Sequence, residues 1–294
     1  MNQNRRKMKM AKAPLQKVKK LAPPPPTKTV KPKKIYQLEA LGDKNRGEKI
    51  IEYGITGMGK TTLASLLPNV AFLSLDGGAD KLRHPITGEK LKGINIETFA
   101  DVRGALQSNI FDSVDTIVID HITELQHLAL DYTFQTIPKD KSTDKAKNIE
   151  DYGYHKGYRY WYDTMRLILP DCDRWVREGK NVILIAQESI AKWTQAGAED
   201  FVMGAPELYH DKSTSTLTAY MSWADHIFRV GYANLTVEDG KAAPVKNRAV
   251  FVHPDATFFA KSRTIPAEFD VVEFKDTKDD SIWRLIFNEN LDSV

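Results

Sequence analysis

The chain has 294 residues, of which 41% are hydrophobic and 28% are charged, a composition typical of globular proteins with a sizeable core. No apolar run approaches the roughly 20 residues of a membrane-spanning helix, and the first residues lack the apolar stretch of a secretory signal, so we expect neither an integral membrane protein nor an exported one. The single cysteine, Cys172, excludes an intramolecular disulfide framework and a cysteine-based zinc finger, and it fits a reducing compartment.

The net charge of +3 hides a strong asymmetry between residues 1–34 and the rest of the chain. Residues 1–34 contain twelve Lys or Arg and no acid, which leaves 30 basic against 39 acidic residues in residues 35–294. The run Pro23–Pro26 favours extended polyproline II. We therefore predict a disordered basic arm at 1–34 and a folded domain at 35–294. The arm suits contact with nucleic acid through counterion release, a solubilising tail or a targeting segment, and the sequence leaves these roles open.

The segment Gly54–Thr62 fits the phosphate-binding pattern G-x-x-x-x-G-K-[ST]. Residues 49–53 before it read as a short strand, and residues 61–67 after it as a helix that ends near Pro68. In such a loop, backbone N–H groups cradle the phosphates, the lysine reaches the β and γ phosphates, and the hydroxyl binds Mg²⁺. The predicted nucleotide-binding residues are Gly54, Ile55, Thr56, Gly57, Met58, Gly59, Lys60, Thr61 and Thr62, with Thr61 as a metal ligand.

Three further apolar runs read as buried parallel strands, each followed by polar residues. Residues 70–75 lead into the turn Asp76–Asp80, residues 116–120 end in an acid, and residues 181–186 lead into an amide. Carboxyl ends of parallel strands meet at one edge of a sheet, where ligands bind. We therefore predict Asp120 as the second magnesium-holding group and Gln187 as the side chain that senses the γ-phosphate or its attacking water.

Helical patterns separate these strands. Residues 101–111 and 158–177 show helical spacing, and Pro170 is expected to break or kink the second helix. The alternation of strands and helices predicts a mainly parallel, twisted α/β sheet with helices on both faces.

The last part of the chain, 216–294, reads as β-rich. We predict strands at 216–220, 226–232, 249–253 and 271–274, a hairpin turn at 238–240, and a final amphipathic helix at 281–291. A motor of the AAA+ type would place a helical lid here, and a nucleotide kinase would interrupt its parallel core with a short lid. The β-rich pattern therefore argues against a typical AAA+ motor and against a nucleotide kinase.

The order of these segments resembles the phage-encoded RecA-like P-loop ATPases, in particular the core-only group linked to single-strand annealing and recombination. The resemblance covers roughly residues 48–270 and rests on the following segments: GITGMGKTTLA, FLSLDGGADKL, TIVIDHITEL, VILIAQES and AKSRTIP. It implies a RecA-like core, ATP and Mg²⁺ as cofactors, single-stranded DNA as a partner, and a homo-oligomer that forms a ring or filament. It also implies a single-strand-binding protein as a further partner, no membrane, and the cytoplasm of an infected bacterial host.

The same resemblance assigns roles residue by residue. Lys60 and Thr61 become phosphate and Mg²⁺ ligands, Asp120 the second acid, and Gln187 the link between nucleotide state and the loop that follows it. The pair Lys261 and Arg263 resembles the basic element that reaches a neighbouring subunit's γ-phosphate, where a cation stabilises the transferring phosphoryl group. Without a neighbour, the pair is a solvated turn.

One position departs from the family pattern. RecA carries a glutamate after its second core strand that activates the attacking water, and Gly78 stands there in this chain. Asp76, Asp80 and Glu124 are the candidates for the general base. The alternative is slow hydrolysis, with ATP acting mainly as an assembly switch.

Two stretches have features suited to binding single strands. Lysines in 139–147 precede a run of aromatic and basic residues that extends to Trp161, although Trp161 and Tyr162 are expected to pack against the sheet. Residues 188–212 follow Gln187, carry Lys192 and Trp193, and are predicted to form a mobile DNA-binding loop. The seven histidines show no metal-ligand spacing and read as structural or surface residues.

The sequence therefore predicts an ATP-dependent protein that binds single-stranded DNA and promotes annealing or homologous recombination as an oligomer. One alternative is a motor or loader ATPase for replication or DNA packaging. Another is a small-molecule phosphotransferase. DNA-stimulated hydrolysis separates the first prediction from the phosphotransferase, and annealing without a partner protein separates it from the motor.

Overall fold

The computed structural model describes residues 46–139, 144–194, 197, 199–233, 235–238, 241–244 and 247–287; the arm at 1–34 lies outside them. The strands are β1 (Lys49–Gly54), β2 (Val70–Ser74), β3 (Gly93–Asn95), β4 (Thr116–Asp120), β5 (Asn181–Trp193), β6 (Phe201–Pro206), β7 (His226–Tyr232), β8 (Leu235–Glu238), β9 (Lys241–Pro244), β10 (Arg248–Phe251) and β11 (Val271–Glu273). The α-helices are α1 (Lys60–Ser65), α2 (Phe99–Gln107), α3 (Ile122–Thr136), α4 (Lys156–Arg166), α5 (Ile168–Arg177), α6 (Thr216–Trp223) and α7 (Ser281–Phe287).

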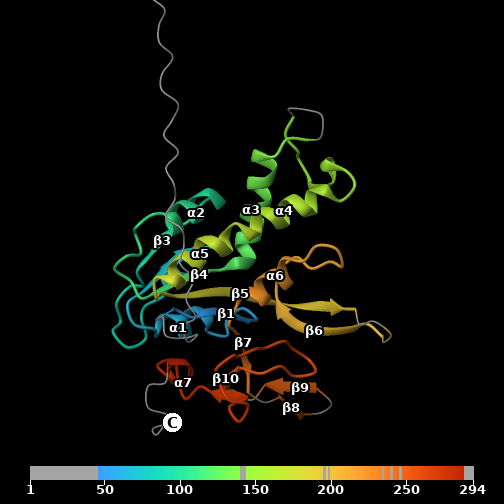
Figure 1. The fold of residues 1–294 in the computed structure, drawn as a ribbon. Helices are drawn as coiled ribbons and strands as arrows, with labels where there is room; N and C mark the ends of the chain where they lie inside the picture. The colour runs from blue at the N-terminus through green and yellow to red at the C-terminus, as the bar shows by residue number, and fades with distance from the viewer. Residues whose placement is uncertain are drawn as a thin grey trace, which may run out of the picture. The chain divides into compact units, whose positions relative to one another are not determined.

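One large sheet organises the molecule (Figure 1). Its strand order is β11-β10-β7-β1-β5-β4-β2-β3. The pairs from β7 to β3 are parallel, whereas β10 and β11 join antiparallel. Strand β5 lies between β1 and β4. The end of the parallel part of β5 therefore lies between the phosphate loop, which follows β1, and the end of β4. The mainly parallel α/β prediction is confirmed.

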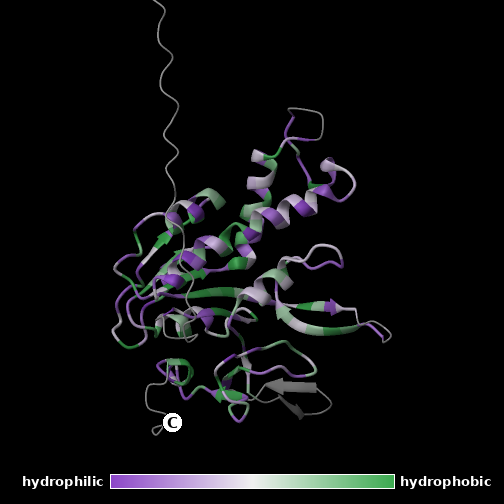
Figure 2. Cartoon of the chain, in the orientation of Figure 1, coloured by the Kyte–Doolittle hydropathy of each residue, from purple (hydrophilic) through white to green (hydrophobic). Residues whose placement is uncertain are grey.

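Helices cover both faces of this sheet. On one face, α2, α3, α5 and α6 bury residues such as Phe99, Leu125 and Trp175 against Ile51 and Leu184 of the sheet. On the other face, α1 and α7 contribute to a second core around Ile50, Phe72 and Ile183. Both faces of the central strands are therefore covered, which explains their nearly continuous apolar sequences, green in Figure 2.

Two predictions about local structure are wrong. Residues 216–220 begin helix α6: the Ser215 hydroxyl accepts a hydrogen bond from the Thr218 N–H, and Leu217, Tyr220 and Met221 are buried at helical spacing. Residues 188–212 do not form one mobile loop, because β5 continues to Trp193 and pairs antiparallel with β6. This β5–β6 hairpin satisfies backbone groups that a loop would leave to solvent.

Other local predictions are confirmed. The predicted helix over 158–177 is interrupted at Leu167, between α4 and α5, so that Pro170 lies in the first turn of α5, where its missing N–H costs no helical hydrogen bond. Strands β8 and β9 form the predicted antiparallel hairpin. Helix α7 ends at Phe287, and the rest of the predicted final helix lies outside the described residues.

Within the described part of the chain, no helix has both the length and the apolar character needed to cross a membrane.

Candidate nucleotide-binding site

The phosphate loop joins β1 to α1 and depends on glycine at several positions. At Gly57 and Gly59, φ is +86° and +96°, the left-handed region that glycine adopts without strain. Gly54 has no room for a side chain, because a Cβ there would lie 2.2 Å from the Val230 carbonyl oxygen of β7. The glycines of the motif therefore serve both the loop conformation and close strand packing.

Lys60 begins α1 and folds its ammonium group back into the loop. Its Nζ donates to the Gly54 carbonyl at 2.7 Å and to the Ile55 carbonyl at 3.2 Å. Only 6% of the residue is exposed. Burial lowers the pKa of Lys60, while the nearby carboxylates of Glu52 and Asp120 oppose that shift. The ammonium group is therefore held inside the loop, at the place where an anion bound by the loop would lie.

Thr61 and Asp120 are in direct contact within the site. The Thr61 Oγ1 donates to Asp120 Oδ2 at 2.8 Å, and Asp120 closes the carboxyl end of β4. Burial raises the pKa of Asp120, and the hydrogen bond from Thr61 partly offsets this. A hydroxyl and a carboxylate are hard oxygen donors of the kind that Mg²⁺ prefers. The pair fits the predicted metal site.

Gln187 of β5 contacts the phosphate loop from the neighbouring strand. It pairs in register with Gly54 of β1, and its Oε1 accepts from Thr56 Oγ1 at 3.1 Å and from Lys60 Nζ at 3.3 Å. Its backbone N–H donates to Thr123 Oγ1 of α3 at 3.0 Å. The amide therefore touches the loop directly, and any ligand that takes over the Lys60 ammonium will change its hydrogen bonding.

The candidates for a general base are placed differently. Asp76 lines the same pocket as Thr61 and Asp120, and its Oδ2 lies 3.3 Å from His121 Nε2. Asp80 and Glu124 do not line that pocket. Of the acids considered from the sequence, Asp76 is the one that the fold brings to the phosphate loop.

Two basic residues of this pocket, His121 and Arg248, were not assigned to the site from the sequence. His121 follows Asp120 directly, so its place after a strand that ends in an acid was a usable signal. Arg248 comes from β10, and its Nη1 donates to the Met58 carbonyl at 3.2 Å. Nothing local marks this arginine, because only the register of β10 brings it to the loop. The pocket encloses about 330 Å³ and is lined by Thr56, Gly57, Gly59, Lys60, Thr61, Thr62, Asp76, Gly78, Leu82, Asp120, His121, Ile185, Gln187 and Arg248.

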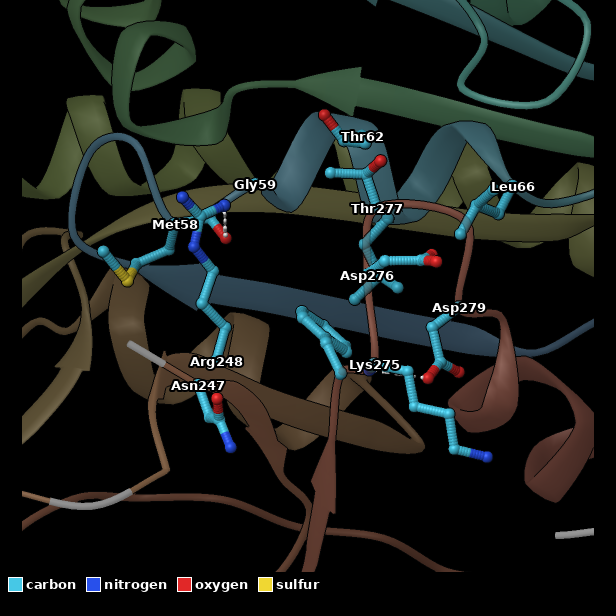
Figure 3. A pocket seen from close by; sticks show the side chains of 12 residues that line it. Met58, Gly59, Thr62, Leu66, Asn247, Arg248, Lys275, Asp276, Thr277 and Asp279 are labelled. Carbon is cyan, nitrogen blue, oxygen red and sulfur yellow. Dashed lines mark hydrogen bonds between the residues drawn. The ribbon is translucent and has the colours of Figure 1, made fainter. Parts of the chain in front are cut away.

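A second hollow of about 240 Å³ adjoins the loop (Figure 3). Met58, Thr62 and Leu66 form one side, and Phe274 with the loop 275–279 forms the other. The Phe274 N–H donates to the Arg248 carbonyl at 2.8 Å, which fixes this C-terminal segment beside β10. The two hollows share Gly59, Thr62 and Arg248, so a ligand in the phosphate loop has space to extend beyond it.

The predicted basic pair lies elsewhere. Lys261 pairs with Ile227 near the start of β7, at the amino end of the parallel strands, whereas the phosphate loop is at their carboxyl end. Its Nζ donates to the carbonyls of Met221 and Ala224. Arg263 forms an ion pair with Asp225 at 3.2 Å, and its side chain is 61% exposed. Neither residue lines the pocket of its own phosphate loop.

The candidate DNA-binding stretches are largely folded where they are described. Lys139 pairs with Asp151 at 3.1 Å, and Trp161 donates its indole N–H to the Gln126 carbonyl at 2.7 Å, as expected for a packed residue. Tyr158 stacks on Tyr209 with a centroid separation of 5.2 Å. Residues 140–143 lie outside the described residues.

The phosphate loop, the buried lysine, the threonine–aspartate pair and the mainly parallel sheet together define a P-loop NTPase. The comparisons agree with this class, because an AAA domain family model (AAA_24) matches residues 46–264, and the chain belongs to this family. A comparison with curated proteins finds no match. Within the described residues, no group of three or more His, Cys, Asp or Glu side chains is arranged to hold a metal ion; a magnesium ion here would rely on phosphate and water oxygens besides Thr61 and Asp120.

Two solved structures are similar to this chain. A KaiC-like protein from the archaeon Pyrococcus horikoshii OT3 is 14% identical, with a TM-score of 0.39, and the match covers 70% of this chain and 78% of that one. The flagellar accessory protein FlaH from Methanocaldococcus jannaschii is 12% identical, with a TM-score of 0.36, and the match covers 79% of this chain and 92% of that one.

Proposed function

We propose that this P-loop ATPase binds single-stranded DNA in an ATP-dependent manner and promotes strand annealing or recombination. The observation that carries the proposal is the course of β5. Gln187 of this strand contacts the phosphate loop, and six residues further on Trp193 ends the same strand. A change in the bound nucleotide would therefore act on Gln187 and, through the same strand, on the β5–β6 hairpin.

The far end of β5 borders a hollow suited to a nucleic acid strand. This hollow of about 770 Å³ is lined by Lys192, Lys212, Trp193, His210, one acid, Asp211, and several hydroxyl side chains. The rings of Trp193 and His210 lie 4.8 Å apart. Cations that neutralise phosphates, next to aromatic rings that stack on bases, are the usual means of binding single strands. Lys192 also pairs with Asp200 at 2.7 Å, and DNA phosphate would compete with that carboxylate.

ATP with Mg²⁺ is the ligand proposed for the phosphate loop. The phosphates would lie against the loop and Lys60, Mg²⁺ would be held by Thr61 and Asp120, and the nucleoside would extend into the adjoining hollow beside Phe274. Bound Mg²⁺ supplies charge neutralisation on the β and γ phosphates. Asp76 is the residue proposed to orient the attacking water, because it lines the pocket beside Asp120.

Assembly of several copies belongs to the same proposal. Lys261 is held by carbonyls of its own chain, whereas most of the Arg263 side chain is exposed. Arg263 is therefore the member of the predicted basic pair proposed to reach a neighbour's phosphate, which would replace Asp225 as its partner.

The test is an ATPase assay with and without single-stranded DNA, alongside DNA affinity at several salt concentrations. Wild type should be stimulated by DNA. The double variant Lys192→Gln/Lys212→Gln should bind ATP normally, and its log–log salt slope for DNA should be smaller by about 2. The matched control is Lys90→Gln/Lys92→Gln, which removes the same charge from two lysines that do not line the hollow at the end of β5.

The outcomes separate the alternatives. Absence of both DNA binding and DNA stimulation would overturn the proposal and favour a phosphotransferase. Annealing that requires an added partner protein would instead favour a motor or loader.

A further inference from the structure

Arg248 is a cation at the phosphate loop that no sequence motif assigns. Strand β10 pairs antiparallel with β7, with Arg248 opposite Tyr232. From there the side chain extends to the loop, where Nη1 donates to the Met58 carbonyl at 3.2 Å. In Figure 3 the guanidinium group lies beside Gly59. A Cβ built on Gly59 would be 3.1 Å from Nη1, so the guanidinium is in close contact with the loop.

Within the described residues, no acidic side chain forms an ion pair with Arg248, in contrast to Arg229 with Glu188 at 2.7 Å and Arg263 with Asp225 at 3.2 Å. Arg248 is half-buried, and the Met58 carbonyl accepts only one of its five N–H donors. A partly buried, uncompensated charge is unfavourable unless an anion approaches it.

The position of Arg248 identifies which anion it would meet. The guanidinium lines the same pocket as Lys60, Thr61 and Asp120 and also lines the adjoining hollow. A guanidinium binds phosphate oxygens in a two-pronged geometry. We propose that Arg248 binds the phosphate chain of the nucleotide from within the same subunit, an inference that rests on the proposed nucleotide site. The site then has a cation of its own besides Lys60, independent of any residue from a neighbouring copy.

A purely structural role makes a different prediction. If Arg248 only anchored the Met58 carbonyl, any long side chain with one N–H donor would replace it. If it binds phosphate, the positive charge itself is required. Arg248→Lys keeps the charge and a donor, whereas Arg248→Gln keeps a donor and removes the charge.

The experiment is titration calorimetry of the full chain with ATP–Mg²⁺ and, separately, with inorganic tripolyphosphate–Mg²⁺, which lacks a nucleoside. Arg248→Gln should weaken both ligands by about ten- to a hundredfold, as expected for a lost charged hydrogen bond. Arg248→Lys should lose less. The matched control is Arg83→Gln, because the Arg83 Nη1 also donates to a backbone carbonyl, that of Gly88, and Arg83 does not line the pocket. Thermal unfolding of each variant verifies that it folds.

Each outcome decides the matter. Equal affinities for Arg248→Lys, Arg248→Gln and wild type would overturn the inference, and so would a loss confined to ATP, because Arg248 would then serve the nucleoside. If wild type bound neither ligand, the proposed nucleotide site would fail, and this inference with it.

Discussion

Two lysines at opposite ends of the sheet make nearly the same contacts. Lys60 donates to the carbonyls of Gly54 and Ile55 at the carboxyl end of β1. Lys261 donates to the carbonyls of Met221 and Ala224 near the amino end of β7. Burial lowers the pKa of both side chains. Hydrogen bonding alone therefore does not distinguish a ligand-binding lysine from a structural one.

The surroundings of Lys60 and Lys261 differ. Lys60 stands at the amino end of α1, where free N–H groups attract anions, and it is next to Asp120 and Gln187. Lys261 meets the carboxyl end of α6, where it satisfies carbonyls that the helix leaves unpaired. The two ammonium groups therefore differ in place: that of Lys60 lies where the start of a helix attracts an anion, whereas that of Lys261 satisfies carbonyls at the end of a helix.

The largest expected effect is on Lys60. Lys60→Ala removes the cation proposed to bind the phosphates, so ATP–Mg²⁺ affinity should fall about 100-fold in titration calorimetry. Lys261→Met, measured in the same way, serves as the control and should keep wild-type affinity. Unchanged ATP binding by Lys60→Ala would remove the basis of the active-site assignment.

Lys261→Met should instead act on stability. Two carbonyls at the end of α6 lose their donor, and the free energy of unfolding should drop by about 2 kcal/mol in urea titrations. ATP turnover per folded molecule should stay at the wild-type level. A variant of normal stability with impaired turnover in the assembled protein would favour the role in trans that the resemblance implies.

The smallest effect is expected for Glu52, a residue of β1 whose carboxyl group interacts electrostatically with Lys60. It is fully buried, and neither carboxylate oxygen has a hydrogen-bond partner among the described residues. Burial raises the pKa of Glu52 well above its ordinary value of 4.5, although Lys60 opposes the shift. The folded state therefore binds a proton that the unfolded state releases, and stability should fall as pH rises above that ordinary value.

Glu52→Gln should remove this slope. In urea titrations without nucleotide, its stability relative to wild type should increase by about 1 kcal/mol between about pH 5 and pH 7. The opposite trend, with Glu52→Gln losing relative stability as pH rises, would mean that Glu52 is ionised and paired with Lys60.

Local sequence was enough to determine the phosphate loop and the strands around it. The glycines of the loop, the apolar runs before Asp120 and Gln187, and the rule that parallel strands share a carboxyl edge together predicted which side chains would meet. These signals work because each depends on neighbours within a few residues, or on a regularity common to all parallel sheets.

Long-range packing decided the rest. Arg248 reaches the loop only through the register of β10 on β7, and Lys261 finds its carbonyls only because α6 ends beside the start of β7. Residues 216–220 alternate in a way that suits a strand, yet the Ser215 cap and the burial of Tyr220 make them a helix. For Arg248 and Lys261 the deciding partner lies far away in the sequence, and for residues 216–220 the side of the segment that is buried outweighs the alternation; the linear pattern shows neither.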